Sequence, residues 1–386
     1  MREQALNHAL TRYESTPHLV FWEMTKACGL ACRHCRASAQ TTPLPGELST
    51  AEGRDLIDQI AAMPGHPPIL ILTGGDCFTR PDLEELVSYA RERQVRVGVA
   101  PSVTPLLTRD AMQRLYDLGV RSVSISLDGS TPETHDGIRG IPGHFERTMD
   151  ALDMLAELGF RLQVNTTVMN RNVTELAGVL RLLEQHQVGI WEVFFLVGVG
   201  RGVELAEVTP AEAEDVCHFL VDATERGETV RTVEAPFFRR VQAERREAPG
   251  DPRDHFLLGP LYDRLRDELS SVDAPRATPT RSHSLATGDG RGIVFVGYDG
   301  EVHASGFLPQ GLGNVRVTPL AEIYGSHEVL TTIRTGALEG ECGRCDYRRL
   351  CGGSRARAFA HFGRVLAEDP ACVRTDAARR THLAVR

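Results

Sequence analysis

The chain has 386 residues, of which 41% are hydrophobic and 25% are charged, and its formal charge at pH 7 is −9. This length and composition are typical of a folded enzyme with two cores, and they exclude a disordered chain. The negative charge gives no general attraction to nucleic acid or to an anionic membrane, and no apolar run reaches the ~20 residues that span a bilayer.

The nine cysteines of the chain are expected to be reduced thiols. The segment from Met1 to Pro17 is polar and charged, not an apolar secretory signal, and a disulfide framework is therefore not expected. We expect a cytoplasmic protein whose thiols are available as ligands.

Short β-type segments alternate with amphipathic helical patterns over the first 234 residues, which predicts stacked βα units and a parallel sheet. The helical patterns include Thr50 to Met63 and Pro81 to Arg93. Six strands fall short of a closed eight-unit barrel, which leaves a lateral opening for a bulky substrate, and the chemistry is expected at the C-terminal strand ends. The six predicted strands are Leu19 to Met24, Ile69 to Thr73, Val95 to Ala100, Ser122 to Leu127, Leu162 to Val168 and Glu192 to Val197.

Three cysteines, Cys28, Cys32 and Cys35, follow the first predicted strand in a CxxxCxxC pattern. Three thiolates on one loop hold three irons of a cubane 4Fe-4S cluster and leave the fourth iron open. An open iron beside a reducible ligand is the arrangement that binds and cleaves S-adenosylmethionine (SAM). Zinc and buried thiols are the alternatives, but structural zinc needs four ligands, and His34, between two of the cysteines in sequence, is an unsuitable fourth.

The CxxxCxxC motif in this position resembles the radical SAM superfamily. The resemblance implies that a glycine-rich turn after the second strand offers polar groups to the amino and carboxylate ends of SAM, and that polar residues on the fourth and fifth strands bond its ribose or methionine end. A common turn, and polar filling of a small barrel, are the alternatives for these residues. The candidate SAM-binding residues are Gly74, Gly75, Asp76, Ser124, Ser126, Asp128 and Asn165.

The C-terminal part begins after a charge- and proline-rich connector, residues 235–290, in which one helix is predicted. A hairpin follows, formed by Ile293 to Val296 and Val302 to His303 around an Asp-Gly turn. Four later thiols suit a fully ligated auxiliary 4Fe-4S cluster, and zinc is the alternative because a CxxC pair with two further cysteines is also a zinc pattern. These four residues are Cys342, Cys345, Cys351 and Cys372.

A hairpin followed by four cysteines resembles the SPASM domain, the auxiliary-cluster extension of one radical SAM branch. The stretch from Cys351 to Cys372 is similar to enzymes of the alternative haem and haem d1 pathways, which act on tetrapyrrole side chains. Ser354 departs from this pattern, because some of these relatives are expected to have cysteine there. The predicted division is an N-terminal lead (1–17), a radical SAM core (18–234), the connector (235–290) and a SPASM-like domain (291–386).

The predicted fold is therefore α/β, a partial (β/α)6 TIM-type barrel with a C-terminal SPASM-like auxiliary iron-sulfur domain. The predicted function is a radical SAM enzyme that reductively cleaves SAM to a 5'-deoxyadenosyl radical and abstracts hydrogen from a substrate carbon, which the resemblance places on a tetrapyrrole side chain. The alternatives are a maturase that forms thioether or carbon–carbon bonds in a peptide, and a non-catalytic iron-sulfur or zinc-binding protein. The expected partners are a tetrapyrrole-like or peptide substrate and a low-potential electron donor such as ferredoxin or flavodoxin. The sequence identifies no catalytic acid or base.

Overall fold

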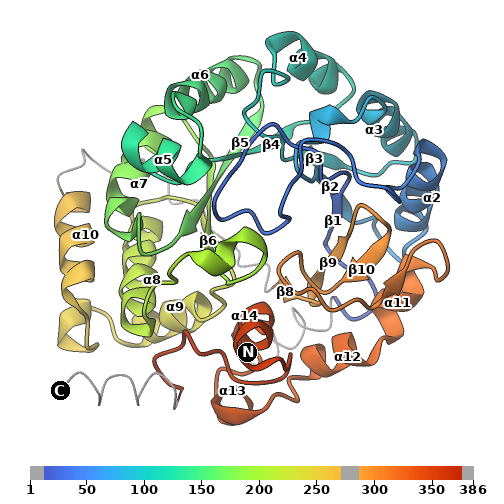
Figure 1. Ribbon diagram of the computed structural model, residues 1–386. Helices are drawn as coiled ribbons and strands as arrows, with labels where there is room; N and C mark the ends of the chain where they lie inside the picture. Colours follow the sequence, from blue (N-terminus) through green and yellow to red (C-terminus); the bar gives the residue numbers. More distant parts are fainter. Residues whose placement is uncertain (1–12, 271–286, 376–386) are drawn as a thin grey trace.

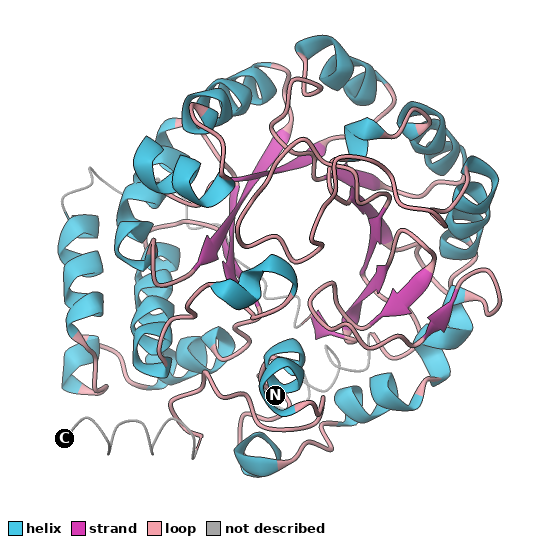
Figure 2. Ribbon diagram, viewed as in Figure 1, coloured by secondary structure: helices cyan, strands magenta, loops and turns pink. Residues whose placement is uncertain are grey.

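The computed structural model describes residues 13–270 and 287–375, and its central element is a curved sheet with helices on the outside (Figures 1 and 2). Seven strands lie in chain order from β1 to β7, and every neighbouring pair among them is parallel. These strands are β1 (Leu19–Glu23), β2 (Ile69–Thr73), β3 (Val97–Val99), β4 (Ser122–Ser126), β5 (Arg161–Val168), β6 (Ile190–Phe195) and β7 (Val230–Val233).

The six predicted strands are confirmed, each with bounds that differ by no more than two residues. The prediction missed β7, which has four residues and an exposed arginine, Arg231, in its second position. So short a strand carries no readable alternation, and only its parallel pairing with β6 defines it. The barrel therefore has one more strand than the sequence predicted.

The outer helices bury one apolar face each against the sheet. Their starts are fixed locally: Ser49 and Glu52 form a capping box at α2, and Thr209 and Glu212 form another at α8. The helices of this layer are α2 (Thr50–Ala61), α3 (Leu83–Glu92), α4 (Arg109–Asp117), α5 (Pro132–Arg139), α6 (His144–Glu157), α7 (Leu176–Gln185) and α8 (Pro210–Glu225).

The connector contains two α-helices where one was predicted. Both α9 (Phe238–Glu247) and α10 (Pro260–Ser270) pack against α8, which explains why α8 is buried over most of its surface. Pro249 and Pro252 lie between the two helices and end the helical pattern, so the sequence reads as irregular. Residues 271–286 of the predicted connector lie outside the described part of the chain.

The predicted C-terminal hairpin is confirmed, and it extends the barrel sheet. β9 (Gly292–Val296) pairs with β10 (Glu301–His303) in antiparallel fashion and with β1 in parallel, Leu19 opposite Ile293. One apolar core runs from the barrel into the C-terminal helices. The sheet and the apolar core both continue across the predicted boundary between the barrel and the C-terminal domain. The predicted domain boundaries therefore stay a prediction. The remaining elements are β8 (Gly288–Asp289), β11 (Gly313–Asn314), α11 (Leu320–Ser326), α12 (Glu328–Thr335), α13 (Gly340–Arg344) and α14 (Arg355–Phe362).

No helix within residues 13–270 and 287–375 is long and apolar enough to cross a membrane.

Candidate active site

The cysteine loop follows β1 at the C-terminal end of the strand. The Cys28 amide donates to the Gln40 carbonyl over 2.7 Å, and the Gln40 amide donates to the Lys26 carbonyl over 2.8 Å, so main-chain bonds close the loop. Cys28 and Cys32 are buried and Cys35 is half-buried, and the three pack in one small cluster. The structure therefore brings together the three thiols that the motif predicts.

The glycine-rich turn after β2 packs directly on this loop. The Gly75 amide donates to the Thr25 carbonyl over 2.8 Å, and the Asp76 amide donates to the Ala27 carbonyl over 2.7 Å. A β-carbon at residue 75 would lie 2.3 Å from the Ala27 oxygen and 2.9 Å from the Cys28 β-carbon. Gly74 has a φ of +148°, which side chains rarely adopt. Both glycines are thus required for the close approach of the turn to the cysteine loop.

The carboxylate of Asp76 is completely buried and already engaged within the protein. It accepts hydrogen bonds from the Phe78 amide (3.2 Å) and the Thr104 hydroxyl (2.7 Å), and burial raises its pKa. This arrangement holds the turn in shape. Ser102 adds a further contact, since its hydroxyl lies 2.8 Å from the Gly75 carbonyl and 3.5 Å from the Cys28 sulfur.

Sequence reasoning missed Ser102 and Thr104. Both follow β3 at its C-terminal end, which is where a barrel of this type carries its chemistry. That position was the available signal, but serine and threonine after a strand are also ordinary turn residues.

Asp128 is buried beside the cysteine loop and pairs with Arg139 over 2.6 Å. Its Oδ1 atom accepts a hydrogen bond from the Thr167 amide over 2.7 Å. The Nε2 atom of His34 lies 3.4 Å from Oδ2, the oxygen that pairs with Arg139. Burial works against ionisation, but Arg139 and then His34 hold the pKa of Asp128 below its usual value. Arg139 in turn reaches the Cys32 sulfur at 3.6 Å. The carboxylate therefore anchors a cation against one of the three thiols.

The predicted inward face of β4 and β5 is polar, as expected. Ser124 and Asn165 line a large cavity inside the barrel, and Ser126 is half-buried and lies opposite Asn165 in the sheet register. Gln163 donates to the Asn165 side chain over 2.9 Å and to Glu192 on β6 over 2.8 Å. These side chains form a polar belt, in which Gln163 and Glu192 are residues that the sequence did not single out.

The loop fits an iron-sulfur cluster and SAM. Three buried nitrogen atoms around it have no hydrogen-bond partner among the described residues: His34 Nδ1, Arg139 Nε and Arg201 Nη2. Arg201 contacts the loop by donating to the Cys32 carbonyl over 2.9 Å. Buried polar atoms are normally satisfied, so these nitrogens indicate that a polar group binds here.

The four C-terminal cysteines line one small cavity of ≈ 30 Å³. Main-chain amides donate to two of the sulfurs: Asp369 to Cys342 over 3.3 Å and Gly353 to Cys351 over 3.4 Å. Hydrogen bonds from main-chain amides to sulfur stabilise thiolate ligands. Across the described ranges, no three His, Cys, Asp or Glu side chains are arranged around the position of one metal ion. Ligation by Cys342, Cys345, Cys351 and Cys372 stays a prediction.

Ser354, which departs from the expected cysteine, has a structural position. It is the N-cap of α14, where its hydroxyl oxygen accepts the Arg357 amide over 2.9 Å, and it donates to the Glu234 carboxylate. The preceding Gly353 has a φ of +65°, and a β-carbon there would lie 2.9 Å from the Cys342 sulfur. This turn is therefore shaped around the cysteines.

One large cavity extends from Arg36 and Thr73, which are next in sequence to Cys35 and to the glycine turn, as far as Cys351 of the C-terminal cysteines. Its volume is ≈ 260 Å³, against ≈ 30 Å³ for the small cysteine cavity. Thr73, the residue before the glycine turn, lines it together with Ser124 and Asn165, and Cys351 lines it from the C-terminal part. Cys351 also lines the small cysteine cavity. A substrate in this space would lie beside the C-terminal cysteines and against the polar residues of β4 and β5.

Comparison with known proteins agrees with this geometry. Residues 22–183 match the family model of the Radical SAM superfamily. The chain is 35% identical to the AdoMet-dependent heme synthase of Methanosarcina barkeri (strain Fusaro / DSM 804) over 364 residues, which cover 93% of this chain and 97% of the relative. The chain belongs to the radical SAM superfamily. Membership brings a 4Fe-4S cluster and SAM to the protein and makes it an enzyme, as predicted.

A further relative bears on the predicted branch, and a solved structure bears on the predicted fold. The pre-heme d1 synthase of Dinoroseobacter shibae (strain DSM 16493 / NCIMB 14021 / DFL 12) is 28% identical over 370 residues, 93% of this chain and 87% of the relative. The structure of Streptococcus suis SuiB bound to precursor peptide SuiA has a TM-score of 0.67 at 13% identity, and the match covers 96% of this chain and 80% of that chain. The relatives confirm the predicted family branch, and the SuiB structure confirms the predicted fold class.

Proposed function

We propose that this radical SAM enzyme acts on a side chain of a carboxylated tetrapyrrole, and the lining of the large cavity carries the proposal. A porphyrin is a flat apolar ring with carboxylates at its edge, so its site needs apolar walls and cationic contacts. Guanidinium groups bind carboxylates in a bidentate manner and also stack on ring faces. The arginines that line the cavity are Arg36, Arg231, Arg239, Arg291, Arg348 and Arg355, and its phenylalanines are Phe21, Phe194, Phe238, Phe295 and Phe307.

The relatives support this substrate class. The heme synthase, over nearly its full length, and the pre-heme d1 synthase are both named for tetrapyrrole products. The peptide alternative is supported more distantly, by the mycofactocin maturase MftC of Mycobacterium tuberculosis (strain CDC 1551 / Oshkosh), 29% identical over 380 residues, and by the SuiB structure, whose likeness concerns the fold alone. The arginine-lined cavity therefore favours the tetrapyrrole.

The residues of the chain have distinct roles in the proposed reaction. When bound, the cluster supplies the electron that breaks the sulfonium bond of SAM, and the resulting 5'-deoxyadenosyl radical abstracts hydrogen from a substrate carbon. We assign Cys28, Cys32 and Cys35 to this cluster. The barrel positions the reactants and excludes water, which a carbon radical requires. For SAM itself we propose contacts from the backbone of Gly74 and Gly75 and from Ser124, Ser126 and Asn165, whereas Asp76 and Asp128 hold the surrounding loops.

The C-terminal cysteines are proposed to bind an auxiliary 4Fe-4S cluster beside the substrate. Cys351 supports this assignment, because it lines both the substrate cavity and the cysteine cavity. The electron for SAM cleavage is proposed to come from a low-potential donor such as ferredoxin or flavodoxin.

The first experiment tests SAM cleavage. The protein is reconstituted anaerobically with iron and sulfide, reduced with dithionite and assayed for 5'-deoxyadenosine with SAM. We expect product from the wild type and none from the Cys28→Ala, Cys32→Ala, Cys35→Ala triple variant. The Cys217→Ala variant, which removes a buried thiol on α8, is the matched control and should keep its iron. Loss of iron from the control alone would contradict the assignment.

The second experiment tests the substrate class. Coproporphyrin III, its iron complex and its tetramethyl ester are compared as additives in the same assay. We expect the free acids to bind and the iron complex or the free base to be altered, with change detected by mass spectrometry, and the ester, which lacks charges for the arginines, to remain unbound. Equal binding of ester and acid would contradict the role of the arginines, and absence of binding by every porphyrin would contradict the tetrapyrrole proposal.

A further inference from the structure

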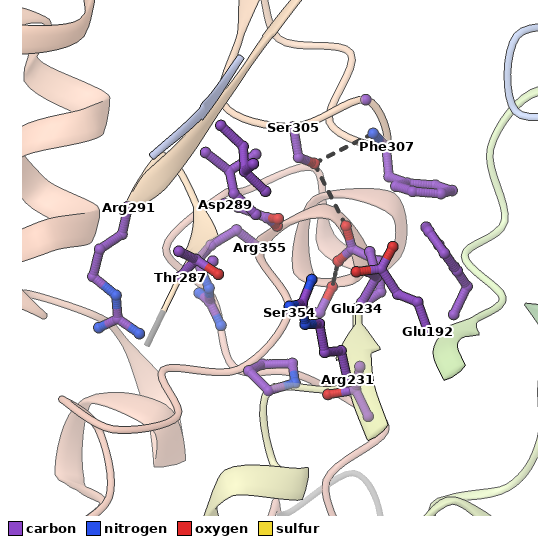
Figure 3. Close-up of a pocket in the computed structure, with 18 of the residues that line it drawn as sticks. Glu192, Arg231, Glu234, Thr287, Asp289, Arg291, Ser305, Phe307, Ser354 and Arg355 are labelled. Atoms are coloured by element: carbon purple, nitrogen blue, oxygen red, sulfur yellow. Dashed lines mark hydrogen bonds between the residues drawn. The ribbon is translucent and has the colours of Figure 1, made fainter. Parts of the chain in front are cut away.

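Two carboxyl groups meet on the wall of the substrate cavity. Glu234 directly follows β7, and Asp289 is the last residue of β8. Both line the large cavity, and Figure 3 shows them side by side below Ser305. We propose that Glu234 and Asp289 together hold one proton and use it to donate a hydrogen bond to a carboxylate of the substrate. This inference rests on the proposed function, since it concerns how the same substrate is bound.

Glu234 is held in an unusual backbone conformation. Its φ is +58°, in the left-handed region that non-glycine residues rarely adopt and that is often found at functional sites. The Arg357 guanidinium donates to its main-chain oxygen over 2.8 Å. The hydroxyl of Ser354 donates to Glu234 Oε2, and that of Ser305 approaches Oε1 at 3.5 Å. Residues from two separate segments thus fix the backbone and the carboxyl group of Glu234 at the cavity wall.

Asp289 has an unsatisfied oxygen. Its Oδ2 atom is buried and has no hydrogen-bond partner among the described residues. A buried acceptor without a partner is destabilising, so such atoms normally meet a ligand or a proton. In the substrate-free protein a proton shared with Glu234 satisfies this oxygen, and when substrate binds the same O–H turns to donate to the substrate carboxylate.

The electrostatics agree with one bound proton. Burial raises the pKa of Glu234 to about 8, and the nearby charge of Asp289 acts in the same direction. Burial also raises the pKa of Asp289. Two carboxyl groups this close do not ionise together near neutral pH. The other charged groups that face the pair are Arg239, Arg291, Arg355, Arg357 and Asp369.

The cations around the pair also make contacts within the protein. Arg357 pairs with Glu207 over 3.0 Å and with Asp369 over 3.3 Å. Arg291 donates to the Arg349 carbonyl over 2.7 Å, and Arg239 donates to the Thr287 carbonyl. For Glu234, burial and the charge of Asp289 outweigh the opposing effect of Arg357 on the pKa.

A protonated carboxyl group adds something that the arginines do not. An O–H donor to a carboxylate makes a short, strong hydrogen bond, and it does so only while the proton is present. The pair therefore makes substrate binding depend on pH within the range where Glu234 titrates. Glutamine at the same position keeps an N–H donor at every pH but does not ionise. The Glu234→Gln variant therefore distinguishes the effect of the hydrogen-bond donor from the effect of ionisation.

The test measures binding of coproporphyrin III to the anaerobically reconstituted protein, without SAM, at pH 6.5 and pH 9. For the wild type we expect the Kd to rise about tenfold at the higher pH, because the donor is lost there. In Glu234→Gln the rise should disappear while the affinity at pH 6.5 stays close to the wild-type value. Glu234→Leu, which has no donor, should bind about tenfold more weakly at both pH values.

Two further variants complete the design. Glu192→Gln is the matched control, because Glu192 lines the same cavity on β6, and it should keep the wild-type pH dependence. Asp289→Asn provides the same test if Glu234→Gln does not fold, as judged by iron content and circular dichroism. Wild-type pH dependence in both pair variants would overturn the inference. A wild type that binds no porphyrin at either pH would instead overturn the proposed function.

Discussion

Arg357 and Asp369 form a buried ion pair, with Nη1 3.3 Å from Oδ1, that fastens the cysteine-bearing C-terminal segment to the barrel. From α14, Arg357 donates to the Leu196 carbonyl (3.2 Å) after β6 and to Glu207 (3.0 Å). Asp369 accepts the Ser354 amide over 2.7 Å and donates its own amide to the Cys342 sulfur. The pair therefore links the C-terminal cysteine segment to the part of the barrel that follows β6.

Removal of Arg357 should strongly destabilise the fold. Arg357→Met leaves the Asp369 carboxylate buried without its partner, and breaking a buried pair in this way costs about 3–5 kcal/mol. Urea denaturation of the reconstituted protein measures the loss. Arg344→Met is the control, because Arg344 is exposed and its pairing with Glu341 on the surface is worth about 0–1 kcal/mol. A similar loss in both variants would contradict the role of the buried pair.

The glycine turn should be intolerant of a methyl group. Gly75→Ala places a β-carbon 2.3 Å from the Ala27 oxygen, so the cysteine loop must move. We expect loss of the cluster assigned to Cys28, Cys32 and Cys35, measured as iron content, and loss of SAM cleavage, measured as 5'-deoxyadenosine. Gly325→Ala, on α11, is the control, since its β-carbon meets nothing within 4 Å. If Gly75→Ala keeps full iron content, the close approach is not essential.

The charges of Arg139 and Asp128 should influence the reduction potential of the cluster assigned to the three N-terminal cysteines. The Arg139 cation lies 3.6 Å from the Cys32 sulfur and favours the reduced, more negative cluster. Arg139→Gln should lower the potential, and Asp128→Asn, which removes the counter-charge, should raise it. We expect shifts of about 59 mV, a tenfold change in the ratio of reduced to oxidised cluster.

EPR-monitored redox titration without SAM measures both potentials. A purely structural role would shift the two variants in the same direction or abolish the cluster in both. Opposite shifts therefore identify the electrostatic effect.

The stability of the protein should fall with pH because of Glu234. Its pKa is about 8 in the folded protein, above the ordinary 4.5, so the folded state binds more protons between these values. The stabilisation is present below the ordinary pKa and is lost as pH rises toward 8, with a slope of at most about 1.36 kcal/mol per pH unit.

Glu234→Gln should flatten this dependence. Urea denaturation at several values between pH 5 and 8 compares the variant with the wild type, and the free energies of unfolding should diverge as pH rises, in favour of the variant. Parallel curves over this range would show that Glu234 is ionised throughout.

The sequence by itself determined the features that depend on neighbours in the chain. The spacing of Cys28, Cys32 and Cys35 and their place after a strand indicated the cluster loop, and local periodicity located six of the seven barrel strands. The Asp-Gly turn predicted the hairpin. Such signals are readable because three close ligands, a turn or an amphipathic face needs only a few adjacent residues to form.

Only the tertiary structure decided which distant groups meet. It paired β9 with β1, added the short β7, and showed that Asp128 holds Arg139 against a thiol. It also brought Glu234 and Asp289 to one cavity wall. Pairings of this kind depend on how the whole sheet curves and packs, and neither partner changes the local pattern of the sequence around the other. These contacts form by long-range packing, and the spacing of residues in the sequence does not predict them.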